Sequence, residues 1–182
     1  MVELTRRTML EAMAAAPLMG AGKDQVAWDF SFPAIEGGTL DFAAFKGRVL
    51  LVTNTASFCG YTYQYEALQR LHAEKSPTGL TVIGVPSRDF HQESPDDVTV
   101  KTFCETRFNI DFPLTSVSHV RGTSAAPFYA WVNAQRNWQP EWNFNKVLIG
   151  RDGRIAGTFG SNEEPDGPSV SHALGRELAR TS

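Results

Sequence analysis

Cysteine is scarce in this 182-residue chain. Only Cys59 and Cys104 are present, and they stand too far apart to form a CxxC redox pair. Two thiols are also too few for a thiolate-rich zinc site or for a scaffold held together by many disulfides. In a chain long enough to bury its own core, two such thiols indicate reactive groups, with inert buried side chains as the alternative.

The sequence also lacks an excess of basic residues and any long apolar run. Its 17 Lys and Arg residues stand against 20 Asp and Glu residues, a net charge of −3, so we expect no nucleic-acid partner. No apolar run approaches the ~20 residues that a transmembrane helix needs, so we expect no membrane span. His119 and His172 have no second ligand at a suitable spacing, and we expect neither a metal site nor a cofactor. What is present, 42% hydrophobic and 20% charged residues, fits one globular domain.

The first 23 residues differ in composition from the rest. Arg6 and Arg7 precede a short, alanine-rich apolar stretch over residues 9–19, and small residues follow at Gly20 and Ala21. This order is typical of a twin-arginine export signal. We therefore divide the chain into a signal or N-terminal extension over residues 1–23 and a domain over residues 24–182, and expect a periplasmic location. Glu11 interrupts the apolar stretch, so an amphipathic N-terminal helix on a cytoplasmic protein stays the alternative.

The remaining chain alternates between strand-like and helix-like segments. Two continuous apolar runs predict buried strands, apolar residues at helical spacing predict helices, and Gly-containing segments predict turns. In order, we expect a hairpin over 28–32 and 38–42, a strand over 48–54, a helix over 61–74, a strand over 80–86, helices over 98–108 and 126–133, strands over 146–150 and 154–159, and a helix over 168–179. This order predicts an α/β fold in which helices flank a central mixed sheet, with an N-terminal β-hairpin.

Cys59 falls in the predicted turn between the first buried strand and the first long helix. Ligands bind beyond the carboxyl ends of strands in open α/β sheets, and the N-terminus of a helix favours a thiolate over a thiol. A thiolate attacks peroxide oxygen and becomes a sulfenic acid. Gly60 would let a substrate approach the backbone closely. Position alone therefore makes Cys59 a candidate nucleophile, with a buried structural cysteine as the alternative.

Three segments carry a family resemblance. They are residues 54–62 (NTASFCGYT), residues 84–93 (GVPSRDFHQE) and residues 142–146 (WNFNK). In this order they resemble the signature motifs of glutathione peroxidases of the cysteine-containing, bacterial type, and the likeness runs from about Val26 to the C-terminus. The resemblance implies a thioredoxin-like fold and a peroxidase that reduces hydrogen peroxide or organic hydroperoxides.

The resemblance also implies a catalytic group of cysteine, glutamine, tryptophan and asparagine. Cys59 corresponds to the nucleophile, and Trp142 and Asn143 correspond to uncharged N–H donors. At the glutamine position this chain has Asp89, which completes the predicted site although an ionised carboxylate donates no hydrogen bond. Arg88 could offset that charge if it pointed inward.

The second motif departs from the family pattern in one further respect. The segment over residues 90–93 is one residue shorter than the corresponding family segment, and His91 stands in place of a glycine. This loop is therefore expected to be remodelled, and Gln92 is given no role.

Cys104 lies where thioredoxin-dependent members of the family carry a resolving cysteine. The resemblance implies that Cys104 attacks the sulfenic acid of Cys59, and that a thioredoxin-like protein, or otherwise glutathione, reduces the resulting disulfide. It further suggests a monomer, because the segment between Trp131 and Trp142 is short. Three alternatives stay open: a core cysteine at position 104, a thiol-based redox sensor or adaptor, and a catalytically weakened family member.

Overall fold

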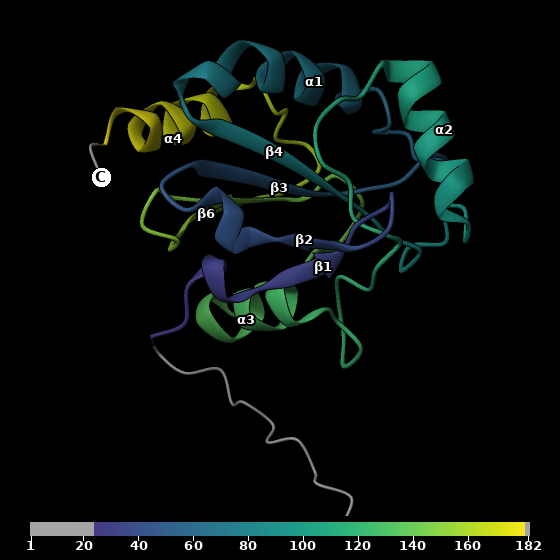
Figure 1. Cartoon of the computed structure of the whole chain (residues 1–182), viewed down its shortest axis with the longest axis horizontal. Coiled ribbons are helices and arrows are strands. Elements are labelled where there is room, and N and C mark those ends of the chain that lie inside the picture. Colours follow the sequence, from purple (N-terminus) through teal and green to yellow (C-terminus); the bar gives the residue numbers. More distant parts are fainter. Residues whose placement is uncertain (1–23, 181–182) are drawn as a thin grey trace, which may run out of the picture.

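The structure of the protein is a computed structural model that describes residues 24–180, so the predicted N-terminal signal lies outside the described residues. Its centre is a four-stranded sheet in the order β4-β3-β5-β6 (Figure 1). The strands are β3 (Val49–Thr55), β4 (Leu80–Pro86), β5 (Lys146–Ile149) and β6 (Ile155–Phe159). β3 and β4 run parallel, whereas β5 lies antiparallel to both β3 and β6, which confirms the predicted mixed sheet.

The sheet is buried on both faces, as the continuous apolar runs predicted. Val49 and Leu51 of β3 pack into one hydrophobic cluster, whereas Leu50 and Val52 pack into another, because successive side chains of a strand point to opposite faces. Helices α1 (Gln64–Lys75) and α4 (Pro168–Ala179) contribute to the first cluster, and α3 (Pro127–Arg136) contributes to the second. Figure 1 shows these helices on the two sides of the sheet.

The predicted N-terminal hairpin is present but shorter than expected. Strands β1 (Ser31–Pro33) and β2 (Thr39–Asp41) pair as a separate two-stranded sheet. Gly37 and Gly38, both with positive φ, supply the left-handed backbone that the connecting turn requires. The outer residues of the predicted strands instead form single 3₁₀ turns over Ala27–Asp29 and Phe42–Phe45.

Helix α2 (Asp97–Phe108) lies at the carboxyl ends of β3 and β4 (Figure 1). It begins after Asp96, whose carboxylate accepts a hydrogen bond of 2.8 Å from the backbone N–H of Thr99. It ends at Asn109, which adopts a left-handed conformation. Its inward face carries Val100 and Cys104, one turn apart, so Cys104 is directed into the core.

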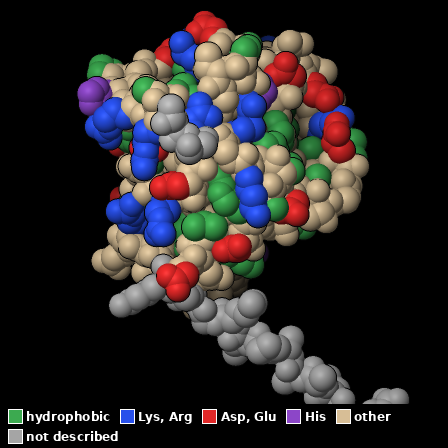
Figure 2. Space-filling model, turned by 60° about the vertical axis from the view of Figure 1, so that its left-hand side comes forward, with side chains coloured by type: hydrophobic (Ala, Val, Ile, Leu, Met, Phe, Trp, Pro, Cys, Tyr) green, Lys and Arg blue, Asp and Glu red, His purple; other side chains and the backbone are tan. Residues whose placement is uncertain are grey.

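Figure 2 turns the left-hand side of Figure 1 forward and shows Lys and Arg side chains together with Asp and Glu side chains on that face. Among residues 24–180, none of the helices combines the length and the apolar character required to span a membrane.

Candidate functional site

Cys59 lies in the turn between β3 and α1, as predicted, and its side chain is largely buried. Its N–H donates to Oγ1 of Thr62 (3.1 Å), and the Thr62 hydroxyl in turn donates to the carbonyl of Ala56 (2.9 Å). The backbone N–H of Tyr61 donates to the Cys59 sulfur at 3.4 Å. The sulfur is therefore held by a local turn, with an N–H group oriented to stabilise negative charge on it.

The segment over residues 142–146 lies beside the end of β3. Asn54 of β3 fixes it through four hydrogen bonds. Its side chain donates to the carbonyl of Trp142 (3.0 Å) and accepts from the N–H of Asn145 (3.0 Å). Its carbonyl accepts from the N–H of Phe144 (2.6 Å), and its N–H donates to the carbonyl of Asn145 (3.2 Å). Trp142 stays 41% exposed and packs on the ring of Phe90, with centroids 5.4 Å apart. This anchoring brings the predicted donors to the end of the strand that leads into Cys59.

Gln92 joins this segment to the Cys59 turn. Its side-chain oxygen accepts a hydrogen bond of 2.9 Å from the amide of Asn143, which is fully buried. Its backbone carbonyl accepts from the N–H of Phe58 at 3.0 Å. Gln92 thus contacts both Asn143 and the residue next to Cys59. Sequence reasoning missed this residue, although the Gln-Glu pair that ends the second motif was a signal for it.

The remodelled loop explains why Gln92 reaches this position. The N–H of His91 bonds to the carbonyl of Arg88 at 2.9 Å, which closes a tight turn over residues 88–91. His91 adopts a φ of 58°, a left-handed conformation that suits the glycine it replaces in the family pattern. The shortened loop therefore keeps its turn and presents Gln92 to Asn143.

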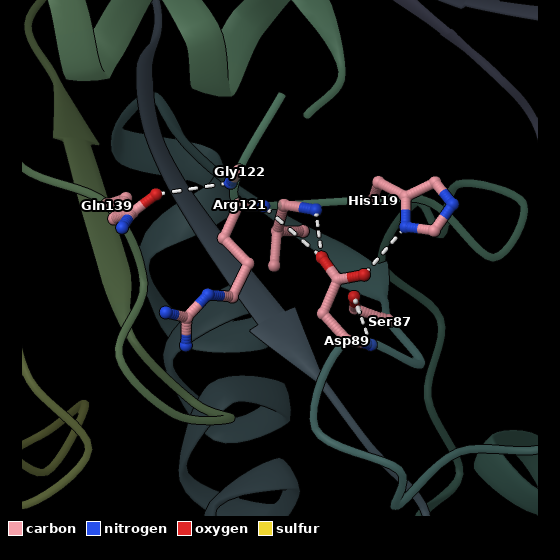
Figure 3. A network of polar contacts seen from close by, with 7 residues as sticks. Ser87, Asp89, His119, Arg121, Gly122 and Gln139 are labelled. Carbon is pink, nitrogen blue, oxygen red and sulfur yellow. Dashed lines mark hydrogen bonds and ion pairs between the residues drawn. The ribbon is translucent and has the colours of Figure 1, made fainter. Parts of the chain in front are cut away.

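Asp89 engages a different part of the chain (Figure 3). One carboxylate oxygen lies 2.6 Å from Nδ1 of His119, and the other accepts from the N–H groups of Val120 (2.7 Å) and Arg121 (3.2 Å). Within residues 24–180, no hydrogen bond links Asp89 to Cys59. Arg88 is exposed, so the condition under which it could offset the Asp89 charge is not met, and the segment over residues 119–121 binds the carboxylate instead.

Asp89 nevertheless influences the site through its neighbours. The segment that it holds carries Arg121, whose guanidinium lies over the ring of Phe90 at 5.4 Å from the centroid. Phe90 is the residue on which Trp142 packs. The geometry thus gives Asp89 a role in supporting one wall of the site.

Cys104 is completely buried on α2 and belongs to the same hydrophobic cluster as Cys59. Both cysteines are free thiols. Phe103, which precedes Cys104 in the chain, packs near Phe58, with ring centroids 6.4 Å apart. Burial raises the pKa of the Cys104 thiol to about 11, an effect that the nearby Tyr65 hydroxyl opposes. Cys104 is therefore protonated at neutral pH.

Lys146 binds the first residue of α1, the helix that follows the Cys59 turn. Its ammonium group is fully buried and donates to Oε1 of Gln64 (2.7 Å) and to the carbonyl of Glu163 (2.6 Å). Burial lowers the pKa of Lys146 to about 8. Because Gln64 is the first residue of α1, this contact fixes the helix start that follows the Cys59 turn.

Taken together, the described side chains offer a sulfur nucleophile and several uncharged N–H donors. In the part of the chain that the structure describes, no group of three or more His, Cys, Asp and Glu side chains is arranged to hold a metal ion. The site therefore suits attack by sulfur on a small electrophile.

Comparisons with known proteins show similarity to the glutathione peroxidase family. A family model described as glutathione peroxidase matches residues 27–133. The hydroperoxy fatty acid reductase gpx1 of Synechocystis is 35% identical, over 81% of this chain and 94% of its own length. The crystal structure of T. cruzi GPX1 is similar with a TM-score of 0.67 and 29% identity, over 86% of this chain and all of that one.

The fold itself has a wider distribution. A thioredoxin family thiol:disulfide interchange protein from Chlorobium tepidum superimposes with a TM-score of 0.58 at 17% identity, over 82% of this chain and 93% of that one. At this identity only the fold is shared, and it confirms the expected thioredoxin-like arrangement.

Proposed function

Because this chain belongs to the glutathione peroxidase family and is a thiol peroxidase, we propose that Cys59 is the nucleophile with which it reduces hydroperoxides. Its thiolate attacks one peroxide oxygen, the O–O bond breaks, and the second oxygen leaves as water or an alcohol after taking a proton. Cys59 is left as a sulfenic acid. The observation that carries this proposal is the position of Cys59 in the turn before α1, with the Tyr61 N–H directed at its sulfur.

Trp142 and Asn143 are proposed to stabilise the departing oxygen. Both side chains carry N–H donors without a charge to lose, and such preorganised donors are effective where negative charge develops. Gln92, bonded to Asn143 at 2.9 Å, would hold that amide in place. Asp89 is proposed to act by supporting Phe90 and Trp142 rather than by contacting sulfur.

The proposed recycling uses Cys104. It attacks the sulfenic sulfur of Cys59, forms a disulfide and releases water, after which a thioredoxin-like dithiol protein reduces the disulfide. Helix α2 would have to loosen for this step, because a disulfide requires Cα atoms within ~7 Å. Glutathione is the alternative reductant, and a monomer is the proposed state because the segment between Trp131 and Trp142 is short.

The preferred substrates are proposed to include hydroperoxides with an apolar chain. The Synechocystis relative is named a hydroperoxy fatty acid reductase. Beside the Cys59 turn, Phe58 and Tyr63 are 66% and 53% exposed. An open groove of about 600 Å³ is lined by the aromatic residues Tyr63, Phe103 and Phe108 and by the polar residues Thr62, Glu66, Thr106 and Arg107. These surfaces would accommodate an acyl chain next to the sulfur.

The test is hydroperoxide consumption by the purified protein, with a thioredoxin system and with glutathione in parallel. Wild type, Cys59→Ser and Cys104→Ser are compared on hydrogen peroxide and on a fatty-acid hydroperoxide. Turnover with thioredoxin that is lost in both variants would support the two-cysteine peroxidase. Loss in Cys59→Ser alone would secure the nucleophile and remove Cys104 from the cycle. An inactive wild type would favour a redox sensor instead.

A further inference from the structure

A set of buried polar groups lies at the carboxyl ends of β3 and β4, below α2, and the catalytic group does not use it. Its members are the hydroxyls of Thr55, Ser57 and Tyr65 and one carboxylate oxygen of Glu93. Each is buried, and within residues 24–180 none has a hydrogen-bond partner of ordinary length and angle. They nevertheless lie close enough to act on the two ionisable members of the set. Thr55 and Glu93 affect the pKa of Tyr65, and Ser57 affects the pKa of Glu93.

Glu93 is the ionisable residue at the centre of this set. It is 6% exposed, and no Lys or Arg among residues 24–180 forms an ion pair with it. Its Oε1 accepts from the N–H of Ser94 at 2.8 Å. Burial raises the pKa of Glu93, and the neighbouring Ser57 and Ser94 oppose this effect. A buried carboxyl without a cationic partner is costly to maintain, which indicates a task beyond packing.

The backbone holds Glu93 beside the turn that carries Cys59. The bond between the Phe58 N–H and the Gln92 carbonyl (3.0 Å) holds residues 92–93 beside the Cys59 turn. On the other side, Cys104 projects from α2 into the same core, and the charges of Glu93 and of the exposed Glu105 both influence its thiol. Glu93 thus lies beside Ser57, two residues before Cys59, and its charge raises the pKa of the Cys104 thiol.

Cys104 needs a proton acceptor for its proposed reaction. Burial raises the pKa of this thiol to about 11, so the reactive thiolate is scarce at neutral pH. Tyr65 cannot take the proton as a phenolate, because burial raises the pKa of its hydroxyl well above the ordinary range. Of the two carboxyl groups whose charges act on the thiol, Glu93 is buried, whereas Glu105 is exposed and lies 3.0 Å from Lys101.

We propose that Glu93 accepts the proton of the Cys104 thiol during the resolving reaction and returns it to the departing oxygen. This inference rests on the proposed two-cysteine cycle. The Cys104 sulfur attacks the sulfenic sulfur of Cys59, the S–S bond forms and the S–O bond breaks. The hydroxide leaves as water with the proton that Glu93 took from Cys104. The thiol and the sulfenic acid thus give one disulfide and one water, with no further oxidant or reductant.

The experiment follows the two steps separately in the full, reduced protein. One equivalent of hydrogen peroxide is added in a stopped-flow instrument, and acid-quenched samples are analysed by mass spectrometry for sulfenic acid and for the Cys59–Cys104 disulfide. Glu93→Gln, which has nearly the same shape, is compared with wild type and with Glu105→Gln as a matched exposed control. General-base assistance is worth ~10²-fold or more, so we expect disulfide formation in Glu93→Gln to be at least ~10-fold slower. Sulfenic acid formation should stay within about twofold in all three proteins.

A pH profile distinguishes proton transfer from a merely structural role. In wild type the rate of disulfide formation should rise with pH as Glu93 ionises. In Glu93→Gln this increase of the rate with pH should be absent. The other groups that interact with Glu93, which are Ser57, Ser94, Tyr65 and Cys104, are the same in both proteins. Glu93→Asp keeps a carboxylate and should recover part of the lost rate.

Three results would overturn the inference. Disulfide formation at the wild-type rate in Glu93→Gln would show that Glu93 is not the acceptor. Equal slowing of both steps, or an Asp variant no better than the Gln variant, would assign Glu93 to packing. A wild-type protein that accumulates sulfenic acid without any disulfide would refute the two-cysteine cycle itself, and the inference with it.

Discussion

At the scale of single residues, Asp89 and Gln92 share one loop but contact different partners. Asp89 accepts hydrogen bonds from the segment over residues 119–121, whereas Gln92 bonds to Asn143 and to the backbone of Phe58. The identity of a residue at a motif position is therefore a poor guide to its role in this shortened loop. Substitution of Gln92 should therefore affect mainly activity, and substitution of Asp89 should affect mainly stability.

We predict that Gln92→Ala lowers kcat/KM for hydroperoxide about 10-fold or more, because Asn143 loses its positioning partner. Asp89→Asn should instead lower the free energy of unfolding by about 1–3 kcal/mol, because an amide N–H replaces an oxygen that faces hydrogen-bond donors. Steady-state kinetics and urea unfolding of both variants measure the two effects. A larger catalytic loss in Asp89→Asn than in Gln92→Ala would contradict this assignment.

Lys146 gives a prediction on pH. Burial lowers its pKa from the ordinary 10.5 to about 8, so between these values the unfolded chain binds more protons at this residue than the folded chain does. Stability contributed by this group therefore increases as pH rises from about 8 to about 10.5. The pKa of Cys104 is raised from 9.0 to about 11, so the stability that this thiol contributes falls as pH rises over part of the same range.

A matched variant isolates the Lys146 contribution. In Lys146→Met the buried amine is absent, whereas Cys104 and the buried tyrosines are unchanged. The free energy of unfolding of wild type should rise relative to that of Lys146→Met between pH 8 and pH 10, as measured by urea unfolding. A difference that does not vary with pH would mean that this amine has an ordinary pKa in the folded protein.

At the scale of elements, most helices and strands could be predicted from local sequence. The strand over 80–86 and the helix over 168–179 were predicted with the observed bounds, and the strand predicted over 154–159 begins one residue later, because apolar runs, Gly turns and a helix-starting Pro168 are local signals. The motifs likewise indicated Cys59, Trp142 and Asn143. The partners of Asp89 and Gln92 could not be predicted, since they depend on the left-handed turn at His91 and on contacts between segments far apart in the chain.

Helix α2 is the element on which the proposed recycling depends. Its first turn is held by Asp96, whose carboxylate accepts from the N–H and the hydroxyl of Thr99. Hydrogen bonding to Thr99 lowers the pKa of Asp96, so this cap is present above the ordinary carboxyl range and is lost in acid. A helix with a weaker start should open more often.

We therefore predict that Asp96→Ala lowers the thermal midpoint and speeds formation of the Cys59–Cys104 disulfide after peroxide addition. The matched control is Asp41→Ala, which removes the carboxylate that accepts from the Ala43 N–H (2.8 Å) in the 3₁₀ turn after β2. The control should lower stability without changing the rate of disulfide formation. An unchanged rate in Asp96→Ala would indicate that opening of the first turn does not limit this step.

At the scale of the whole molecule, the chemistry is gathered at one end of the sheet. Cys59, Gln92, Trp142 and α2 lie at or beside the carboxyl ends of β3 and β4. A reductant must therefore approach the end that carries α2 to reach a Cys59–Cys104 disulfide. Which reductant is available depends on the compartment of the protein.

The N-terminal sequence bears directly on that compartment. Arg6 and Arg7 precede an apolar stretch and small residues, and this order predicts twin-arginine export to the periplasm. There, cytoplasmic thioredoxin would be absent, and a dithiol carrier supplied through the membrane would have to reduce the disulfide. We expect the full chain to be recovered from the periplasm with a shortened N-terminus, and an Arg6→Lys, Arg7→Lys variant to stay in the cytoplasm at full length. Cell fractionation with mass spectrometry of the N-terminus measures both, and the same cytoplasmic location for the two proteins would remove the need for a carrier supplied through the membrane.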